Sequence, residues 1–190
     1  MSLTLVLGGT RSGKSAVAEH LTAKAATGGA AVTYIATGTA TDPAMAERIA
    51  RHRARRPAAW STVEVADAAE LPAALRALSG VVLLDSLGTW VAAHPDLDPD
   101  GAGLAAALSA RRGDTVVVSE EVGLSVHPPT PVGRRFVDAL GEVNRAVSEA
   151  ADRAVLVVAG RMLELGPALA LAPTVVPAVD LGPPPAEGEA

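Results

Sequence analysis

The feature that most constrains the fold of this chain is a short apolar run that leads directly into a glycine-rich loop. Leu3 to Leu7 form a short, mainly apolar run, and residues 8–15 read Gly-Gly-Thr-Arg-Ser-Gly-Lys-Ser. An apolar run of this length that ends in glycines predicts a buried strand. The segment from Lys14 to Ala26, closed by two glycines, predicts a helix. We therefore expect a strand, a tight loop and a helix in that order.

The loop matches the pattern G-x-x-x-x-G-K-[ST], in which each part helps to hold a polyphosphate. Glycines let backbone N–H groups turn inward around the phosphates, and the following helix adds the partial positive charge of its N-terminus. In this pattern Lys14 reaches the β and γ phosphates and Ser15 ligates Mg²⁺. A chance match is the alternative, but the strand before the loop and the helix after it argue against one. We expect a nucleoside triphosphate to bind at Gly8, Gly9, Thr10, Arg11, Ser12, Gly13, Lys14 and Ser15.

Beyond the loop, continuous apolar runs alternate with segments of helical character. Continuous rather than alternating apolar strands are typical of a mostly parallel sheet with helices on both faces, so the expected class is α/β. We expect one domain over residues 1–166 and a proline-rich, partly disordered tail over 167–190. The expected strands are 31–36, 61–65, 81–85, 115–119 and 154–159. The expected helices are 43–56, with Asp42 as its N-cap, 68–78, 104–111 and 136–151. We expect loops at 96–103 and 127–133.

Composition narrows the class of protein. The 190 residues, 49% of them hydrophobic, suit one folded domain, and the lack of cysteine excludes disulfides, thiolate zinc sites and cysteine nucleophiles. A net charge of −5 argues against a protein that mainly coats nucleic acid or anionic membrane. The start Met1-Ser2-Leu3 has no basic leader, and no apolar stretch approaches the roughly 18 residues of a membrane span. We expect a cytoplasmic protein.

A carboxylate follows the buried run Val81 to Leu84. Asp85 is positioned to hold Mg²⁺ through water beside the phosphate loop, although an Asp there could instead cap the next turn. Residues 85–88 also spell the D-x-x-G of switch GTPases. Those proteins need an N-K-x-D motif as well, and the single asparagine, Asn144, is followed by Arg145. The sequence therefore argues against a switch GTPase.

The helix that begins at Pro43 carries a histidine among arginines. Met45, Ile49 and His52 share one face, and five arginines lie within residues 48–56. One interpretation is a partly buried histidine on a helix with a solvated basic face. The other is a nucleophilic imidazole among phosphate-binding arginines. A third interpretation is a surface that binds nucleic acid, but the negative net charge of the chain and its 2% aromatic content argue against it. We interpret the other three histidines as structural or solvated: His20, His94 and His127.

Several particular strings together make the chain resemble a known family over about residues 3–165. Besides the phosphate loop they include Tyr34-Ile-Ala-Thr37, Arg48-Ile49 leading to His52, Arg56-Pro57 with Trp60, Glu121-Val-Gly123, and the segment from Phe136 through Asn144 to Asp152. The family is the bifunctional adenosylcobinamide kinase/adenosylcobinamide-phosphate guanylyltransferase of the cobalamin pathway. The resemblance implies a P-loop NTPase fold of the RecA-like type and assembly as a homotrimer.

The resemblance implies two reactions. The first phosphorylates the aminopropanol hydroxyl of adenosylcobinamide from ATP or GTP. The second moves GMP from GTP onto that phosphate, with release of pyrophosphate, through a GMP–histidine intermediate on His52. Where the family's motifs match this sequence, the resemblance implies catalytic roles for His52 and Lys14 and metal binding by Ser15 and Asp85. It places these further residues in the nucleotide site: Ala36, Thr37, Gly38, His52, Arg53, Ala54, Arg55, Glu64 and Asp85.

The chain departs from the family pattern at three positions. Arg51 stands where some members carry a second histidine, Asp85 where the acid is often Glu, and Glu120 where Asn is expected. These departures bear on Mg²⁺ geometry and nucleotide preference. The alternatives to a bifunctional enzyme are a single-function P-loop kinase with a structural His52 and a RecA-like nucleic-acid binder. Only the bifunctional enzyme predicts a nucleotide covalently attached to the protein.

Overall fold

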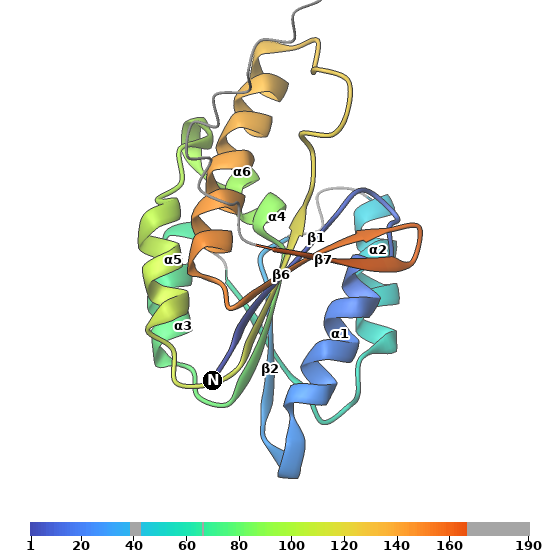
Figure 1. The fold of residues 1–190 in the computed structure, drawn as a ribbon, viewed down its shortest axis with the longest axis vertical. Coiled ribbons are helices and arrows are strands. Elements are labelled where there is room, and N and C mark those ends of the chain that lie inside the picture. The colour runs from blue at the N-terminus through green and yellow to red at the C-terminus, as the bar shows by residue number, and fades with distance from the viewer. Residues whose placement is uncertain (39–42, 66, 167–190) are drawn as a thin grey trace, which may run out of the picture.

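A seven-stranded sheet runs through the part of the chain that the structure describes, residues 1–38, 43–65 and 67–166 of a computed structural model (Figure 1). Its strand order is β3-β2-β4-β5-β1-β6-β7, and neighbouring strands are parallel except for β6 and β7. The expected mostly parallel α/β fold is confirmed. The strands are β1 (Leu3–Gly8), β2 (Val32–Ala36), β3 (Ser61–Glu64), β4 (Val81–Asp85), β5 (Thr115–Glu120), β6 (Arg153–Val158) and β7 (Arg161–Leu165).

Helices cover both faces of the sheet. Figure 1 shows α1 and α2 on one face and α3, α5 and α6 on the other, where α4 also packs against α6. The helices are α1 (Lys14–Ala25), α2 (Pro43–Arg55), α3 (Leu71–Ala77), α4 (Leu87–Ala92), α5 (Gly101–Ser109) and α6 (Pro131–Ala150). None of the helices in the described part of the chain is long and apolar enough to cross a membrane.

Each face of the sheet has its own apolar core, because successive strand residues point to opposite sides. Leu5 of β1 is fully buried with Trp90 and Leu140 under α4 and α6, whereas the next residue, Val6, is buried with Tyr34 on the α1 face. This alternation decides which side chains at the carboxyl ends of the strands can meet.

Four elements differ from the sequence expectation. Helix α5 begins at Gly101, inside the expected loop 96–103, because the Asp100 carboxylate accepts the Gly103 N–H as an N-cap. Helix α6 begins at Pro131 rather than at 136, because the Thr130 hydroxyl accepts the Gly133 N–H as an N-cap and Pro131 occupies the first helical position. Helix α4, which directly follows β4, was not expected. Strand β7 was not expected either; it pairs antiparallel with β6 and is exposed along its length.

The turn between β6 and β7 contacts the phosphate loop. Gly160 has a positive φ of 74°, and its N–H donates to the Ser12 carbonyl at 2.8 Å. The hairpin therefore supports the loop from outside the parallel sheet. Helix α2 begins at Pro43 as expected, while the proposed cap Asp42 and the tail 167–190 lie outside the described residues.

Candidate nucleotide site and its histidine

The glycine-rich segment connects β1 to α1 at the carboxyl edge of the sheet, as the sequence predicts. Gly13 has φ 95°, a left-handed conformation that favours glycine, and it leads into the first turn of α1. Lys14 and Ser15 are buried there, and the backbone N–H of Lys14 donates to the Ser12 hydroxyl at 3.3 Å. Thr10 and Arg11 are exposed at the tip of the loop. The segment has the strand–loop–helix geometry of a phosphate-binding loop.

The loop lysine is held from two sides. Lys14 Nζ lies 3.5 Å from Glu120 Oε1 and donates to the Gly9 carbonyl at 3.4 Å, and only 4% of the Lys14 side chain is exposed. A buried ammonium requires such partners. Glu120 occupies the last position of β5, directly opposite Gly8 of β1 in the sheet register. The lysine that the sequence assigns to phosphates is thus paired with a carboxylate in this structure.

Glu120 also joins the phosphate loop to the start of α4. Its carboxylate accepts hydrogen bonds from the Ser86 hydroxyl at 3.0 and 3.1 Å and from the Gly88 N–H at 3.1 Å. A Cβ at Gly88 would collide with this carboxylate, which explains the glycine at that position. The glycine of the D-x-x-G string therefore has a structural role here.

His52 faces the carboxylate at the end of β4. Its Nδ1 lies 3.6 Å from Asp85 Oδ2, and the His52 and Asp85 side chains are 19% and 12% exposed. Asp85 Oδ2 also accepts the Tyr34 hydroxyl at 3.1 Å. Sequence reasoning assigned Asp85 to the metal and His52 to the nucleotide. The structure brings the two side chains together.

Arg56 contacts both Tyr34 and His52. Its guanidinium lies 3.6 Å from the centroid of the Tyr34 ring, and its Nε donates to the His52 carbonyl at 3.2 Å. Burial, reinforced by the Asp85 carboxylate, raises the pKa of Tyr34 well above its usual value, and the Arg56 charge only partly opposes this shift. Tyr34 is therefore a neutral hydrogen-bond donor to Asp85.

The residues after β2 fix the turn that follows β4. Thr37 is buried; its hydroxyl donates to the Ser86 carbonyl at 2.6 Å and accepts the Ser86 N–H at 3.0 Å. Its own N–H donates to the Asp85 carbonyl at 3.3 Å. Ala36 ends β2, and Gly38 lies against Thr89 of α4. Of the residues expected around the nucleotide, Ala36 and Thr37 lie beside Asp85 and Gly38 lies beside α4.

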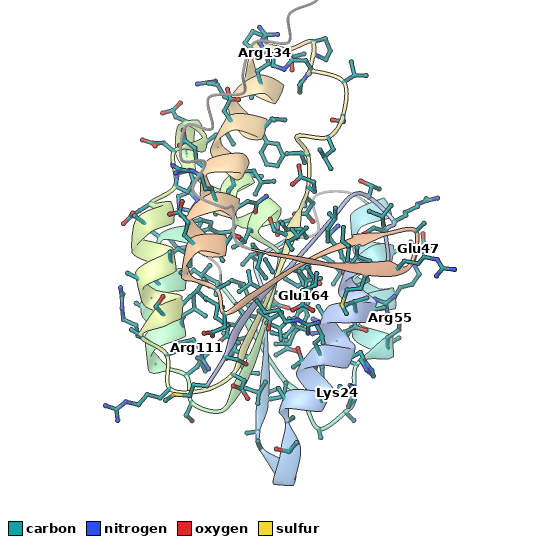
Figure 2. The ribbon with its side chains drawn as sticks, viewed as in Figure 1. Lys24, Glu47, Arg55, Arg111, Arg134 and Glu164 are labelled. Carbon is teal, nitrogen blue, oxygen red and sulfur yellow. The ribbon has the colours of Figure 1, made fainter. Side chains whose placement is uncertain are left out.

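The remaining expected site residues make ion pairs on the outside of α2. Arg53 pairs with Glu64 at 3.0 Å and Arg55 pairs with Glu19 of α1 at 3.2 Å, while Ala54 is exposed. Figure 2 shows Arg55 on the side of the sheet that carries α1 and α2. These contacts attach α2 to β3 and to α1. Arg53 and Arg55 thus lie on the face of the sheet that carries α1, but neither forms an ion pair with the described residues of the phosphate loop.

Oxygen ligands near the loop fit Mg²⁺. The Ser15 hydroxyl and the carboxylates of Asp85 and Glu120 are the hard donors that this ion prefers. The described residues contain no group of three or more His, Cys or acidic side chains that could hold a metal by themselves. A Mg²⁺ bound mainly through nucleotide phosphates needs only one or two carboxylates. The donor set therefore suits a metal that arrives with the nucleotide.

The loop, the strand order and the two opposed faces define a P-loop nucleotide-binding protein. Its fold is similar to that of a solved ATPase from the type III secretion system of pathogenic bacteria, with a TM-score of 0.52 over 82% of this chain and half of that one. Sequence identity to that ATPase is 13%, so the likeness shows the fold alone.

Sequence comparison gives the particular family. Residues 4–165 match the CobU family, described as cobinamide kinase / cobinamide phosphate guanyltransferase. The chain is 41% identical to the bifunctional adenosylcobalamin biosynthesis protein CobP of Pseudomonas aeruginosa, over 85% of this chain and 95% of that protein. It is 36% identical to the corresponding CobU of Salmonella typhimurium, over 83% and 96%. The chain belongs to this enzyme family, which confirms the resemblance.

Sequence reasoning missed three side chains that organise the site. Glu120 was noted only as a departure from the family pattern, and Tyr34 and Arg56 only as parts of family strings. The signal for Glu120 was available, because it follows a buried strand just as Asp85 does. The contacts of Tyr34 and Arg56 had no comparable local signal, since both depend on how α2 packs over β2.

Proposed function

We propose that this chain carries out both family reactions. It phosphorylates the aminopropanol hydroxyl of adenosylcobinamide from ATP or GTP, and it then transfers GMP from GTP to the resulting phosphate. The second transfer passes through a GMP–His52 intermediate. The observation that carries this proposal is the half-buried imidazole of His52, which faces Asp85 at the same sheet edge and on the same face as Lys14.

In the proposed site GTP binds in the same position for both transfers, and each transfer consumes its own nucleotide. The β and γ phosphates of GTP lie in the loop against Lys14 and the backbone N–H groups, and its α phosphate faces His52. When nucleotide binds, the phosphates replace Glu120 as the partner of Lys14. Mg²⁺ held by Ser15 and Asp85 would supply charge neutralisation on the phosphates. The loop and Lys14 stabilise the charge that develops during transfer.

Asp85 prepares His52 for attack in this proposal. With Nδ1 turned toward the Asp85 carboxylate, Nδ1 carries the proton and Nε2 keeps its lone pair for phosphorus. As the Nε2–P bond forms, pyrophosphate leaves with the electrons of the broken P–O bond, and Asp85 stabilises the positive imidazolium. The phosphate on cobinamide then displaces His52. Covalent catalysis thus divides one displacement into two.

The test uses GTP labelled at the α phosphate. Labelled GTP and Mg²⁺ are incubated with the protein, which is then denatured and examined for label that survives base and is released by acid, as a phosphoramidate requires. We expect label on the wild type and none on His52→Ala. The matched control is His20→Ala, an exposed histidine of α1, which should keep the label. An unlabelled wild type that still phosphorylates cobinamide would reduce the protein to a kinase alone.

We also propose that the protein works as a homotrimer on a corrinoid substrate. Family membership supports both statements, and the corrinoid is named in the family description. Sedimentation equilibrium of the full chain gives the oligomeric state directly. A monomer that is active in both reactions would contradict the trimer.

A further inference from the structure

A cavity of about 280 Å³ lies at the end of β5, between the loop that follows it and α6. Leu7, Val122 and Val137 form its apolar wall, and Glu121 and Arg145 are among its polar groups. None of these residues belongs to the nucleotide site described above. In open parallel sheets, ligands bind outside the carboxyl ends of the strands, which is where this cavity lies.

The cavity adjoins the phosphate loop. Leu7 immediately precedes Gly8, the first residue of the loop, and the Glu121 N–H donates to the Gly8 carbonyl at 3.2 Å. A group bound in the cavity is therefore next to the chain segment that would hold the γ phosphate. No comparable cavity is needed for the nucleotide, whose expected residues lie on the other face.

Two adjacent glutamates divide the sheet edge between its two faces. Glu120 points to the α1 face and contacts Lys14, while Glu121 points to the α6 face and lines the cavity. Asn144 of α6 braces this junction, because its side chain donates to the Glu120 carbonyl at 3.0 Å and accepts the Ser119 hydroxyl at 2.6 Å. A single peptide bond, between Glu120 and Glu121, thus separates the carboxylate that contacts Lys14 from the one that lines the cavity.

We propose that this cavity is the acceptor site of the kinase step, which holds the hydroxyl-bearing amide arm of the corrinoid. The inference rests on the proposed function and adds the substrate's position to it. Small-molecule pockets measure about 300–1,000 Å³, so a cavity of this size accepts one arm while the macrocycle remains outside. The apolar wall suits the methylenes and methyl group of the arm, and Arg145 and Ser148 suit its amide.

Glu121 receives the hydroxyl proton in this arrangement. Its Oε1 accepts the Gly123 N–H at 2.8 Å, and among the described residues its Oε2 has no hydrogen-bond donor. The acceptor oxygen forms a bond to the γ phosphorus, and the bond from that phosphorus to the β–γ bridging oxygen breaks. The nucleoside diphosphate leaves with that electron pair, and the hydroxyl proton passes to Glu121.

The consequence is that the kinase transfer and the guanylylation of His52 take place from opposite faces of the sheet. The corrinoid hydroxyl approaches the γ phosphate from the α6 face, and His52 approaches the α phosphate from the α2 face. The two half-reactions can therefore be disabled separately.

The first experiment fills the cavity. Gly141 of α6 lines it, and a Cβ added there meets nothing within 4 Å. Gly141→Leu also favours the helix, so the variant should fold. We expect KM for adenosylcobinamide in the kinase reaction to rise roughly tenfold or more, with the α-label on His52 unchanged. Glu142→Leu, at an exposed neighbouring position outside the cavity, should leave both reactions at the wild-type level.

The second experiment removes the proton acceptor. Glu121→Gln should lower kcat for cobinamide phosphorylation by about 10²–10⁴, with little change in KM and normal labelling of His52. An unchanged KM in Gly141→Leu, or equal loss of the His52 label in either variant, would overturn the acceptor site. A wild type with neither activity would instead refute the proposed function itself, so the two failures are distinguishable.

Discussion

At the scale of single residues, the site contains a lysine that already has an anionic partner. Glu120 lies 3.5 Å from Lys14 and is itself only 24% exposed, so a nucleotide must displace this carboxylate or share the lysine with it. Water screens such a pair weakly when it is buried. The carboxylate therefore opposes the binding of a polyphosphate that lacks a metal.

Replacing Glu120 with Gln tests this competition. We expect Glu120→Gln to bind GTP about tenfold more tightly than the wild type when Mg²⁺ is removed with a chelator, because one negative charge beside the phosphates is lost. Isothermal titration calorimetry measures the effect. Glu142→Gln changes the net charge equally at an exposed site and should leave the affinity unaltered. Equal affinities in the two variants would show that Glu120 does not compete.

Tyr34 gives a pH-dependent prediction. Burial raises the pKa of its phenol, whereas a tyrosine in an unfolded chain ionises near pH 10. Above about pH 10 the unfolded state loses a proton that the native state keeps, so stability falls as pH rises further.

Absorbance of tyrosinate follows this directly, because Tyr34 is the single tyrosine of the chain. During an alkaline titration we expect the signal to appear together with the loss of native circular dichroism. Tyr34→Phe should give no such signal. Ionisation near pH 10 in a protein that retains its native spectrum would contradict the buried donor.

At the scale of elements, the buried side chain of Arg111 connects α3 to β4 and β5. The Arg111 guanidinium donates to the Thr115 hydroxyl and to the carbonyls of Leu75, Leu78 and Gly80, at 2.8 to 3.0 Å. It thereby ties the end of α3 to the starts of β4 and β5. Burial lowers the pKa of Arg111, and these acceptors offset the cost of burying its charge. Figure 2 shows it on the side away from Arg55.

Removal of this side chain should destabilise the fold. We expect Arg111→Ala to lower the free energy of unfolding by roughly 3 kcal/mol or more, since buried carbonyls lose their donors. Urea denaturation measures this. Arg112→Ala, at an exposed neighbour, should stay within about 0.5 kcal/mol of the wild type. If the two variants were equally stable, the Arg111 contacts would contribute nothing net.

Each element that the local sequence did not predict has a physical explanation in the structure. Strand β7 is exposed, carries two charged residues and exists because a tight turn returns it to β6. Helix α4 spans only Leu87–Ala92 and follows β4 without a loop, and its cap depends on Ser86 and Thr89 together. The start of α6 had a local signal, a Thr followed by Pro, that the proline-rich surroundings obscured. Long apolar runs were predicted well because burial alone specifies them.

At the scale of the whole molecule, the last described strand and the family match end at the same residue. The residues of both apolar cores lie between Leu3 and Val157, β7 ends at Leu165, and the family match ends at residue 165. The tail expected from its prolines stays a prediction, as do the cytoplasmic location and the homotrimer.

Truncation tests where the folded unit ends. A chain that stops at Gly166 should keep the wild-type Tm and the α-label on His52, because it retains every core residue named above. A chain that stops at Val158 also loses β7 and the Gly160 contact to Ser12, and it should bind nucleotide more weakly. Calorimetry and the labelling assay distinguish the two. A large drop in Tm for the first truncation would place part of the fold in the tail.

The sequence by itself determined the class of fold and the kind of chemistry. Apolar runs, a glycine loop with Lys14 and Ser15, and a histidine among arginines are local patterns, and local patterns specify strands, helices and reactive groups. Only the tertiary structure decided which acid serves which group. Asp85, Glu120 and Glu121 all follow buried strands and look equivalent in sequence. Strand order brings them to one edge, and the two-residue alternation of strands sends Asp85 to His52, Glu120 to Lys14 and Glu121 to the opposite face.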